Sequence, residues 1–170
     1  MVPSGIKRTA CRKGANVWVP TDYFFEQALL QFSEDSVSSP FIGVLAGAYV
    51  GLGINPVPAL NRGTLLSQIV EASFPSYARK PLTWRLPYFG VNGLWDLEAE
   101  CVHWQPTGPD ANQVVTCAFV ATAISGGQLL LATTLPSPGV DMSSIQDALT
   151  GIVRFGLDPL ANYGDFTQVD

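Results

Sequence analysis

Three acidic side chains form the densest group of potentially catalytic residues in the sequence. Asp96, Glu98 and Glu100 alternate with apolar residues in the segment 94–104. Alternation with a period of two places all three carboxylates on one face of a strand. Carboxylates can bind calcium or supply the acid and base of a glycosidase. A calcium ion takes about six to eight oxygens, and a glycosidase pair faces across a cleft. A row on a straight strand therefore favours a solvated face, or ion pairs with another subunit.

Nucleophilic chemistry would have to use His103, the only histidine in the sequence. Cys101 lies two residues away on the same expected strand. Two side chains that project side by side from one strand cannot form the direct hydrogen bond that proton transfer from a nucleophile needs. We therefore expect an edge or partly buried histidine beside Trp104. The sequence contains no Gly-x-Ser-x-Gly elbow, P-loop or dinucleotide fingerprint. Cys11, Cys101 and Cys117 lack the number and spacing of a disulfide framework or metal knot, and we expect the latter two to pack as small apolar residues. We expect no enzyme activity, and no catalytic, cofactor or metal site.

Tryptophan side chains offer a different kind of chemistry, because sugars stack on aromatic rings. Trp84, Trp95 and Trp104 could form such a platform. Trp95 falls on the expected core face of its strand, and Trp104 is out of register with it. The pattern favours core packing or anchors between subunits over a sugar-binding row.

The composition indicates one folded domain that is poor in charge. The chain has 170 residues, of which 14% are charged and 11% are aromatic, whereas about 25% are charged in ordinary domains. Interface cores are depleted of charge and enriched in aromatic residues, so we expect other subunits to cover part of the surface. The longest apolar stretch, 41–52, is too short to span a bilayer. No apolar run follows the N-terminal basic residues, so neither a signal peptide nor a membrane partner is expected.

The first twenty residues form a basic arm. Lys7, Arg8, Arg12 and Lys13 are four of the nine basic residues, and no acidic residue precedes position 22 in a chain of net charge −5. Such an arm is either solvated or lies on an acidic neighbour. Four positive charges on an acidic protein do not predict nucleic-acid binding. We expect an extended arm over 1–20, anchored by Trp18.

Hydrophobic periodicity after the arm predicts a mainly β domain over 21–160. A helix is expected after Thr21 or Asp22, with Phe25 on its apolar stripe, and a second, short helix over 64–72. Expected strands are separated by Gly and Pro turns and occupy 41–52, 81–86, 94–104, 114–124, 128–135 and 150–157. In the first of them, glycines every four residues suggest the close approach of another backbone. This spacing predicts an antiparallel β-sandwich or barrel-like domain with one or two short helices, followed by a C-terminal tail over 161–170.

The most distinctive segment reads Val-Glu-Ala-Ser-Phe-Pro-Ser-Tyr-Ala-Arg-Lys-Pro-Leu-Thr-Trp over residues 70–84. We call it the 70–84 block. Pro75 would end the preceding helix, Tyr77 can bury its ring and point its hydroxyl at the backbone, and Arg79 can hold a carboxylate through two bonds. Trp84 would then begin the core of the sandwich. Apart from Ser76 in place of a glycine, the block resembles one that recurs in small structural proteins of tailed bacteriophages. The resemblance extends over about 65–160, including the Gly-Gly hairpin and the last strand.

The resemblance implies a structural protein of the virus particle. It leads us to expect a capsid decoration, or cement, protein that stabilises the lattice of the major capsid protein. The alternatives are a tail fibre, spike or adaptor component and, further off, a module that binds host glycans. We expect a homo-oligomer, a dimer or trimer, in a particle assembled in the host cytoplasm, with the major capsid protein and other virion proteins as partners. The candidate interface residues are Lys7, Arg8, Arg12, Lys13, Trp18, Tyr77 and Arg79.

Overall fold

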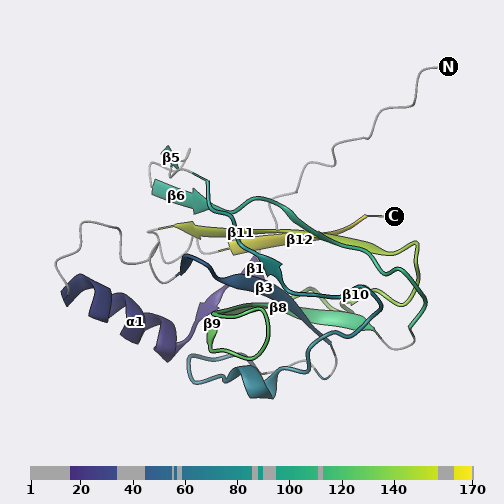
Figure 1. Ribbon diagram of the computed structural model, residues 1–170, viewed down its shortest axis with the longest axis horizontal. Coiled ribbons are helices and arrows are strands. Elements are labelled where there is room, and N and C mark those ends of the chain that lie inside the picture. Colours follow the sequence, from purple (N-terminus) through teal and green to yellow (C-terminus); the bar gives the residue numbers. More distant parts are fainter. Residues whose placement is uncertain are drawn as a thin grey trace.

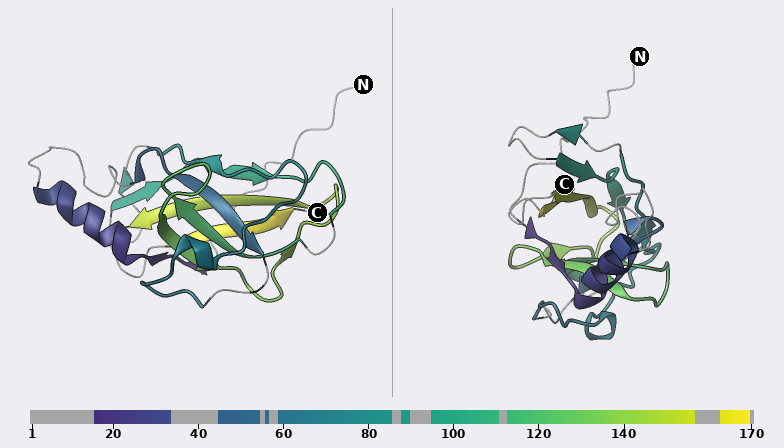
Figure 2. Two further views of the ribbon diagram at one scale, coloured as in Figure 1. Left: turned by 60° about the horizontal axis from the view of Figure 1, so that its bottom comes forward. Right: turned by 90° about the vertical axis from the view of Figure 1, so that its left-hand side faces the viewer.

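Two antiparallel sheets packed face to face form the body of the protein (Figures 1 and 2). The computed structural model describes residues 16–33, 45–54, 56, 59–85, 88–89, 95–110, 113–156 and 163–169. Over these residues the chain is mainly β, with one α-helix, α1 (Asp22–Ser33), and a short 3-10 helix, η1 (Leu66–Gln68). The predicted mainly β, antiparallel class is confirmed. Each sheet has edge strands, so the described strands form a sandwich of open sheets.

The two sheets have six strands each. The first sheet has the order β1 (Asn16–Val17), β12 (Tyr163–Val169), β11 (Ala148–Gly156), β6 (Trp95–Glu98) and β5 (Tyr88–Phe89), and β7 (Val102–Trp104) also pairs with β11. The second sheet has the order β2 (Val19–Pro20), β9 (Leu129–Thr134), β8 (Val114–Ala121), β3 (Tyr49–Ile54) and β4 (Lys80–Pro81), and β10 (Val140–Asp141) pairs with β8.

The two ends of the chain contribute more to the sheets than the sequence suggests. Residues 16–17 pair with β12 of the first sheet, and residues 19–20 pair with β9 of the second. Trp18 lies between them, 2% exposed and within the core. The expected C-terminal tail over 161–170 instead contributes β12, which pairs with β11 along most of its length. The apolar residues Tyr163, Phe166 and Val169 recur at every third position of this strand, so its local sequence lacks the period of two that predicts a strand. Pairing with β11 supplies its backbone partners.

Helix α1 begins where its capping residues predict. The Thr21 hydroxyl accepts a hydrogen bond from the Phe24 amide at 3.3 Å and donates one to the Leu129 carbonyl at 2.6 Å. Asp22 stands in the first turn, where its charge favours the helix dipole. Phe24 is fully buried, whereas Phe25, which was expected on the apolar stripe, is 36% exposed. The helix is thus confirmed, but its buried face begins one residue earlier than predicted.

Strand β8 is buried on both faces, because a layer of chain covers the outside of the second sheet. Ala118 and Val120 face the core between the sheets, whereas Cys117, Phe119 and Ala121 face outward into a smaller apolar cluster. A register shift between Gly53 and Ile54 of β3 interrupts the alternation of β8. Val115 therefore packs in the main core and not with Cys117, as a strict period of two would place it.

The segment 59–72 forms this outer layer, and its structure differs from the predicted helix over 64–72. Only η1 is helical, and residues 70–72 run beside β3 instead. The Ile54 amide donates to the Val70 carbonyl at 2.8 Å, and the Ala72 amide donates to the Leu52 carbonyl at 2.9 Å. The free edge of β3 thus satisfies backbone groups that a helix would have paired internally. Ile69 then packs with Cys117 and Phe119.

Two further predicted strands are shorter or broken. Of the described residues in the segment 81–86, Pro81 belongs to a strand, β4 (Lys80–Pro81), and Trp84 forms an isolated bridge with Ala99. The segment 94–104 divides into β6 and β7, because the Ala99 amide bonds the Val153 carbonyl and the Glu100 amide bonds the Thr83 carbonyl. This change of partner ends the alternation. Cys101 is exposed rather than on the core face, and Glu98 is 8% exposed rather than on a solvated face.

The glycines of the segment 41–52 have different roles. Gly43 lies outside the described residues. Gly47 has φ +72° in the turn before β3, so the strand begins only at residue 49. Gly51 lies in β3 beneath the ring of Phe119, and a Cβ atom there would overlap that ring. The close neighbour is thus a side chain, not the second backbone that the spacing suggested.

We predict that Gly51→Ala lowers the free energy of unfolding by about 1–3 kcal/mol, because the added methyl group overpacks a buried site. Urea unfolding of the purified chain measures the loss. In a Phe119→Leu background, where the ring is gone, the same Gly51→Ala change should cost clearly less. An equal cost in both backgrounds would show that the ring of Phe119 is not what excludes a side chain at this position.

Candidate functional site

Arg79 is the centre of a polar cluster on the outside of the second sheet. Its side chain is nearly buried, and its Nε and Nη2 atoms donate to Oε1 and Oε2 of Glu71 at 2.8 and 2.7 Å. Its Nη1 atom donates to the Ala123 and Gly126 carbonyls, each at 2.7 Å. The guanidinium carbon lies 5.1 Å from the centre of the Phe119 ring. The two-bond grip on a carboxylate that we expected of Arg79 is confirmed, and Glu71 is its partner.

Tyr77 joins the same cluster from the other side of the carboxylate. Its hydroxyl donates to Oε1 of Glu71 at 2.8 Å and accepts a hydrogen bond from the Leu52 amide at 3.0 Å. The ring meets that of Phe74 edge to face, with centroids 5.3 Å apart. The predicted burial of the ring and bonding of the hydroxyl to backbone are confirmed.

Electrostatics and burial keep the Tyr77 hydroxyl protonated and the Arg79 guanidinium charged. Burial raises the pKa of Tyr77 far above its usual value, and the neighbouring Glu71 carboxylate adds to the rise. A hydrogen bond to Glu71 raises the pKa of Arg79, which stays charged. Because the pKa of Tyr77 is higher in the folded chain than in the unfolded one, its contribution to stability is present at neutral pH. This contribution declines as the pH rises above about 10.

The cluster supports the architecture rather than a reaction. The guanidinium of Arg79 is occupied by the Glu71 carboxylate and two backbone carbonyls. It joins the outer layer, the 70–84 block and the turn 122–127 between β8 and β9. Four of the five N–H donors of Arg79 thus bond groups of the same chain, and the hydroxyl of Tyr77 stays protonated at neutral pH because its pKa is raised.

Ser76 adopts a backbone conformation that favours glycine. Its φ is +73°, in the left-handed region, and its hydroxyl donates to the Gln105 carbonyl at 2.8 Å. The Tyr77 amide closes the turn on the Phe74 carbonyl at 2.8 Å. This is the position at which the bacteriophage block has glycine. The side-chain hydrogen bond helps to hold the serine in the same turn.

The carboxylates of Glu98 and Glu100 have different surroundings. Glu98 forms ion pairs with Nη1 of Arg85 at 3.3 Å and with Nε of Arg154 at 2.5 Å. Glu100 is exposed beyond the end of β6, and the side chain of Asp96 lies outside the described ones. Within the part of the chain that the structure describes, no three His, Cys, Asp or Glu side chains form a group that could hold a metal ion.

The tryptophans do not form an exposed row. Trp104 is 2% exposed, and its Nε1 atom donates to the Ala78 carbonyl at 2.9 Å. Trp84 is partly buried against the core, and its Nε1 atom donates to the Leu45 carbonyl at 3.0 Å. The side chain of Trp95 lies outside the described ones. A sugar-stacking platform that uses Trp84 and Trp104 together is therefore absent.

The histidine and the two described cysteines lie in different surroundings. His103 is exposed on β7, with Nδ1 3.0 Å from the Thr150 hydroxyl of β11. Cys117 is fully buried, and burial raises the pKa of its thiol to about 12. Cys101 is exposed, so only Cys117 packs as the small apolar residue that we expected of both. Cys11 lies outside the described residues.

The candidate interface residues are distributed differently from the expectation. Lys7, Arg8, Arg12 and Lys13 lie outside the described residues. Trp18 anchors residues 16–20 in the core of its own chain. Tyr77 and Arg79 direct their polar groups to Glu71 and to backbone of the same chain.

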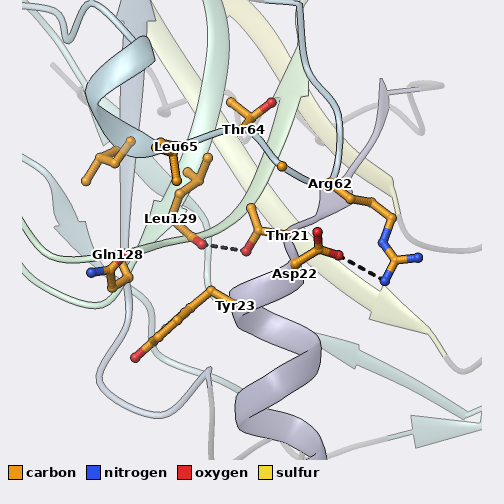
Figure 3. A pocket seen from close by; sticks show the side chains of 10 residues that line it. Thr21, Asp22, Tyr23, Arg62, Thr64, Leu65, Gln128 and Leu129 are labelled. Carbon is orange, nitrogen blue, oxygen red and sulfur yellow. Dashed lines mark hydrogen bonds and ion pairs between the residues drawn. The ribbon is translucent and has the colours of Figure 1, made fainter.

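One cavity was not foreseen from the sequence. It has a volume of about 250 Å³ and lies where the start of α1, residues 62–66 and the start of β9 meet. Figure 3 shows the ion pair of Asp22 and Arg62 on one side, Gln128 on the other, and Leu65 and Leu129 between them. The two charges are 3.0 Å apart and exposed. The three segments that line the cavity are about 40 and about 60 positions apart in the sequence, so no local motif could have indicated their meeting.

Comparisons with protein families, with curated proteins and with solved structures find no match to this chain. Among the described residues, no helix combines the length and the apolar character needed to cross a bilayer. What the chain does must therefore be argued from its own residues.

We predict that Arg79→Lys lowers the free energy of unfolding by about 2–4 kcal/mol, because lysine keeps the charge but cannot form all four hydrogen bonds of the buried guanidinium. The matched control is Arg62→Lys, in an exposed pair, which should cost less than about 0.5 kcal/mol. Urea unfolding measures both. Similar losses in the two variants would contradict a central role for Arg79.

We predict that the two described thiols differ sharply in reactivity. In a Cys11→Ser variant at pH 8, one thiol per native chain should react rapidly with an aromatic disulfide reagent, because Cys101 is exposed. Cys117, buried and protonated, should react only after unfolding. Replacing Cys101 by serine in that background should remove the rapid phase. Two rapidly reacting thiols in the native Cys11→Ser chain would contradict the burial of Cys117.

Proposed function

We propose that this chain is a structural protein of a bacteriophage particle, a capsid decoration protein that stabilises the lattice of the major capsid protein. It acts mechanically. Apolar area that the bound chain buries across neighbouring capsomers raises the barrier to their separation when packaged DNA presses on the shell.

The observation that best supports the proposal is the structural role of the 70–84 block. Glu71, Tyr77 and Arg79 bond one another and the backbone, and Trp84 packs against the core. The left-handed turn falls at Ser76, where the bacteriophage block has glycine. The most distinctive residues of the chain thus build the sandwich, which is what a structural protein requires of them.

The charge-poor composition supports the same proposal. Only 14% of the residues are charged, and a surface so poor in charge is typical of a protein that other subunits cover. A tail fibre, spike or adaptor built on the same kind of sandwich would share these features. The glycan-binding alternative loses its expected platform, because Trp84 and Trp104 pack inward.

The proposal predicts many copies of the chain in each particle. Quantitative mass spectrometry of purified particles, against the major capsid protein, should give a ratio near one to one or a simple fraction of it. A handful of copies would overturn the decoration role in favour of a tail component. Absence from the particle would overturn a structural role altogether.

The same particles allow a test of the mechanism. Particles that lack the chain should release their DNA at a lower temperature than complete ones, and addition of the purified chain should restore the higher temperature. A chain carrying Arg79→Lys should restore less at temperatures where that variant is partly unfolded. Equal DNA release with and without the chain would contradict a cementing role.

A further inference from the structure

Most of the exposed large apolar side chains gather on the outside of the second sheet. Among the described residues, five large apolar side chains are exposed, and four of them lie on α1, the segment 59–72 or the turn 122–127. They are Phe25, Leu65, Val70 and Ile124, which are 36%, 59%, 46% and 60% exposed. The fifth, Ile145, is 53% exposed and lies in the turn between β10 and β11. We call the surface that carries the four the outer face.

Contacts between side chains join the three segments into one surface. Arg79 bonds Glu71, next to Val70, and also the carbonyls on both sides of the turn that carries Ile124. The guanidinium carbon of Arg62 lies 4.8 Å from the centre of the Phe25 ring, which connects α1 to the segment 59–72. The cavity of Figure 3 lies between two of these segments, α1 and 59–72, and the start of β9, with Leu65 on its lining.

The outer face is also nearly free of net charge. No charged residue occurs from Ala111 to Val140 or from Gly63 to Val70, although the chain has a net charge of −5. The exposed charges of Asp22 and Arg62 neutralise one another across 3.0 Å, and α1 adds one exposed acid, Glu26, beside Phe25. Exposed apolar side chains without surrounding charge are typical of the core of a protein interface.

We propose that the outer face binds a second copy of this chain. A copy carries the same negative charge, so two copies approach most favourably through their neutral faces, whereas a basic partner would be drawn to the acidic remainder. The neighbouring Asp22 and Arg62 suit a two-fold axis, because a rotated copy presents the same anion and cation in the opposite order. Leu65 and Ile124 supply the apolar contact.

The proposed interface is the surface through which the oligomer expected under the proposed function would form. It rests on the proposed function only for the location of that oligomer in a virus particle. The purified chain alone tests it. A failure of the interface would therefore be distinguishable from a failure of the decoration role, which depends on the copy number in particles.

The experiment is sedimentation velocity of the full chain over a series of concentrations, with aspartate placed at three exposed apolar positions. The native chain should form a dimer. Leu65→Asp and Ile124→Asp should each weaken the dimer at least tenfold, because a charge would be buried in the apolar centre. Ile145→Asp, equally exposed but off the outer face, should leave it unchanged. Circular dichroism and urea unfolding confirm that each variant is folded.

Three outcomes would overturn the proposal. They are a native chain that stays monomeric at every concentration, an oligomer that both outer-face variants leave intact, and an oligomer that Ile145→Asp weakens as much as Ile124→Asp does. If either outer-face aspartate impairs folding, the neutral substitutions Leu65→Gln and Ile124→Gln replace it. These should still weaken the dimer, and an unchanged dimer would again overturn the proposal.

Discussion

The ion pair between the buried Arg79 and the partly exposed Glu71 is the interaction on which the second sheet depends. Its five hydrogen bonds, counting the one from Tyr77, tie together a covering layer, a turn between two strands and the block that leads into β4. The covering layer in turn shields Cys117 and Phe119 from water. Without the pair, the apolar outside of β8 would lose its cover, and the buried guanidinium of Arg79 would be left without its carboxylate partner.

This arrangement separates the parts of the molecule that build it from those that can meet a partner. The distinctive polar residues point inward or bond backbone, and the tryptophans at 18 and 104 fill the core. The outer layer then presents leucine, valine and isoleucine to solvent on a nearly neutral surface. Hydrogen-bonded polar groups beneath an apolar surface suit a protein that binds its neighbours through that surface. The hydrogen bonds hold the backbone of the outer layer in one conformation.

The local sequence pattern was sufficient to predict some of the helices and strands and insufficient to predict others. The helix 22–33 and the strands 114–121, 129–134 and 148–156 follow from capping, apolar periodicity and the Gly-Gly turn. The two hydrogen bonds from Arg79 to a carboxylate could be predicted from the chemistry of guanidinium in an acidic chain. The identity of that carboxylate, Glu71, could not be predicted. The break at 99–101, strand β12 and the cavity at α1 depend on backbone and side-chain partners in other segments of the chain. A one-dimensional pattern contains no information about such partners, and this is why the carboxylate row over 96–100 was expected to be continuous.

Native-state hydrogen exchange tests most directly whether one ion pair holds the outer layer. Amide exchange of the native chain would be compared with that of Arg79→Lys, in conditions where both are folded. The account predicts that amides of residues 69–72 and 122–128 lose protection together, whereas those of β11 in the first sheet keep theirs. Unchanged protection in both segments, or a loss confined to one of them, would contradict the view that Arg79 joins them.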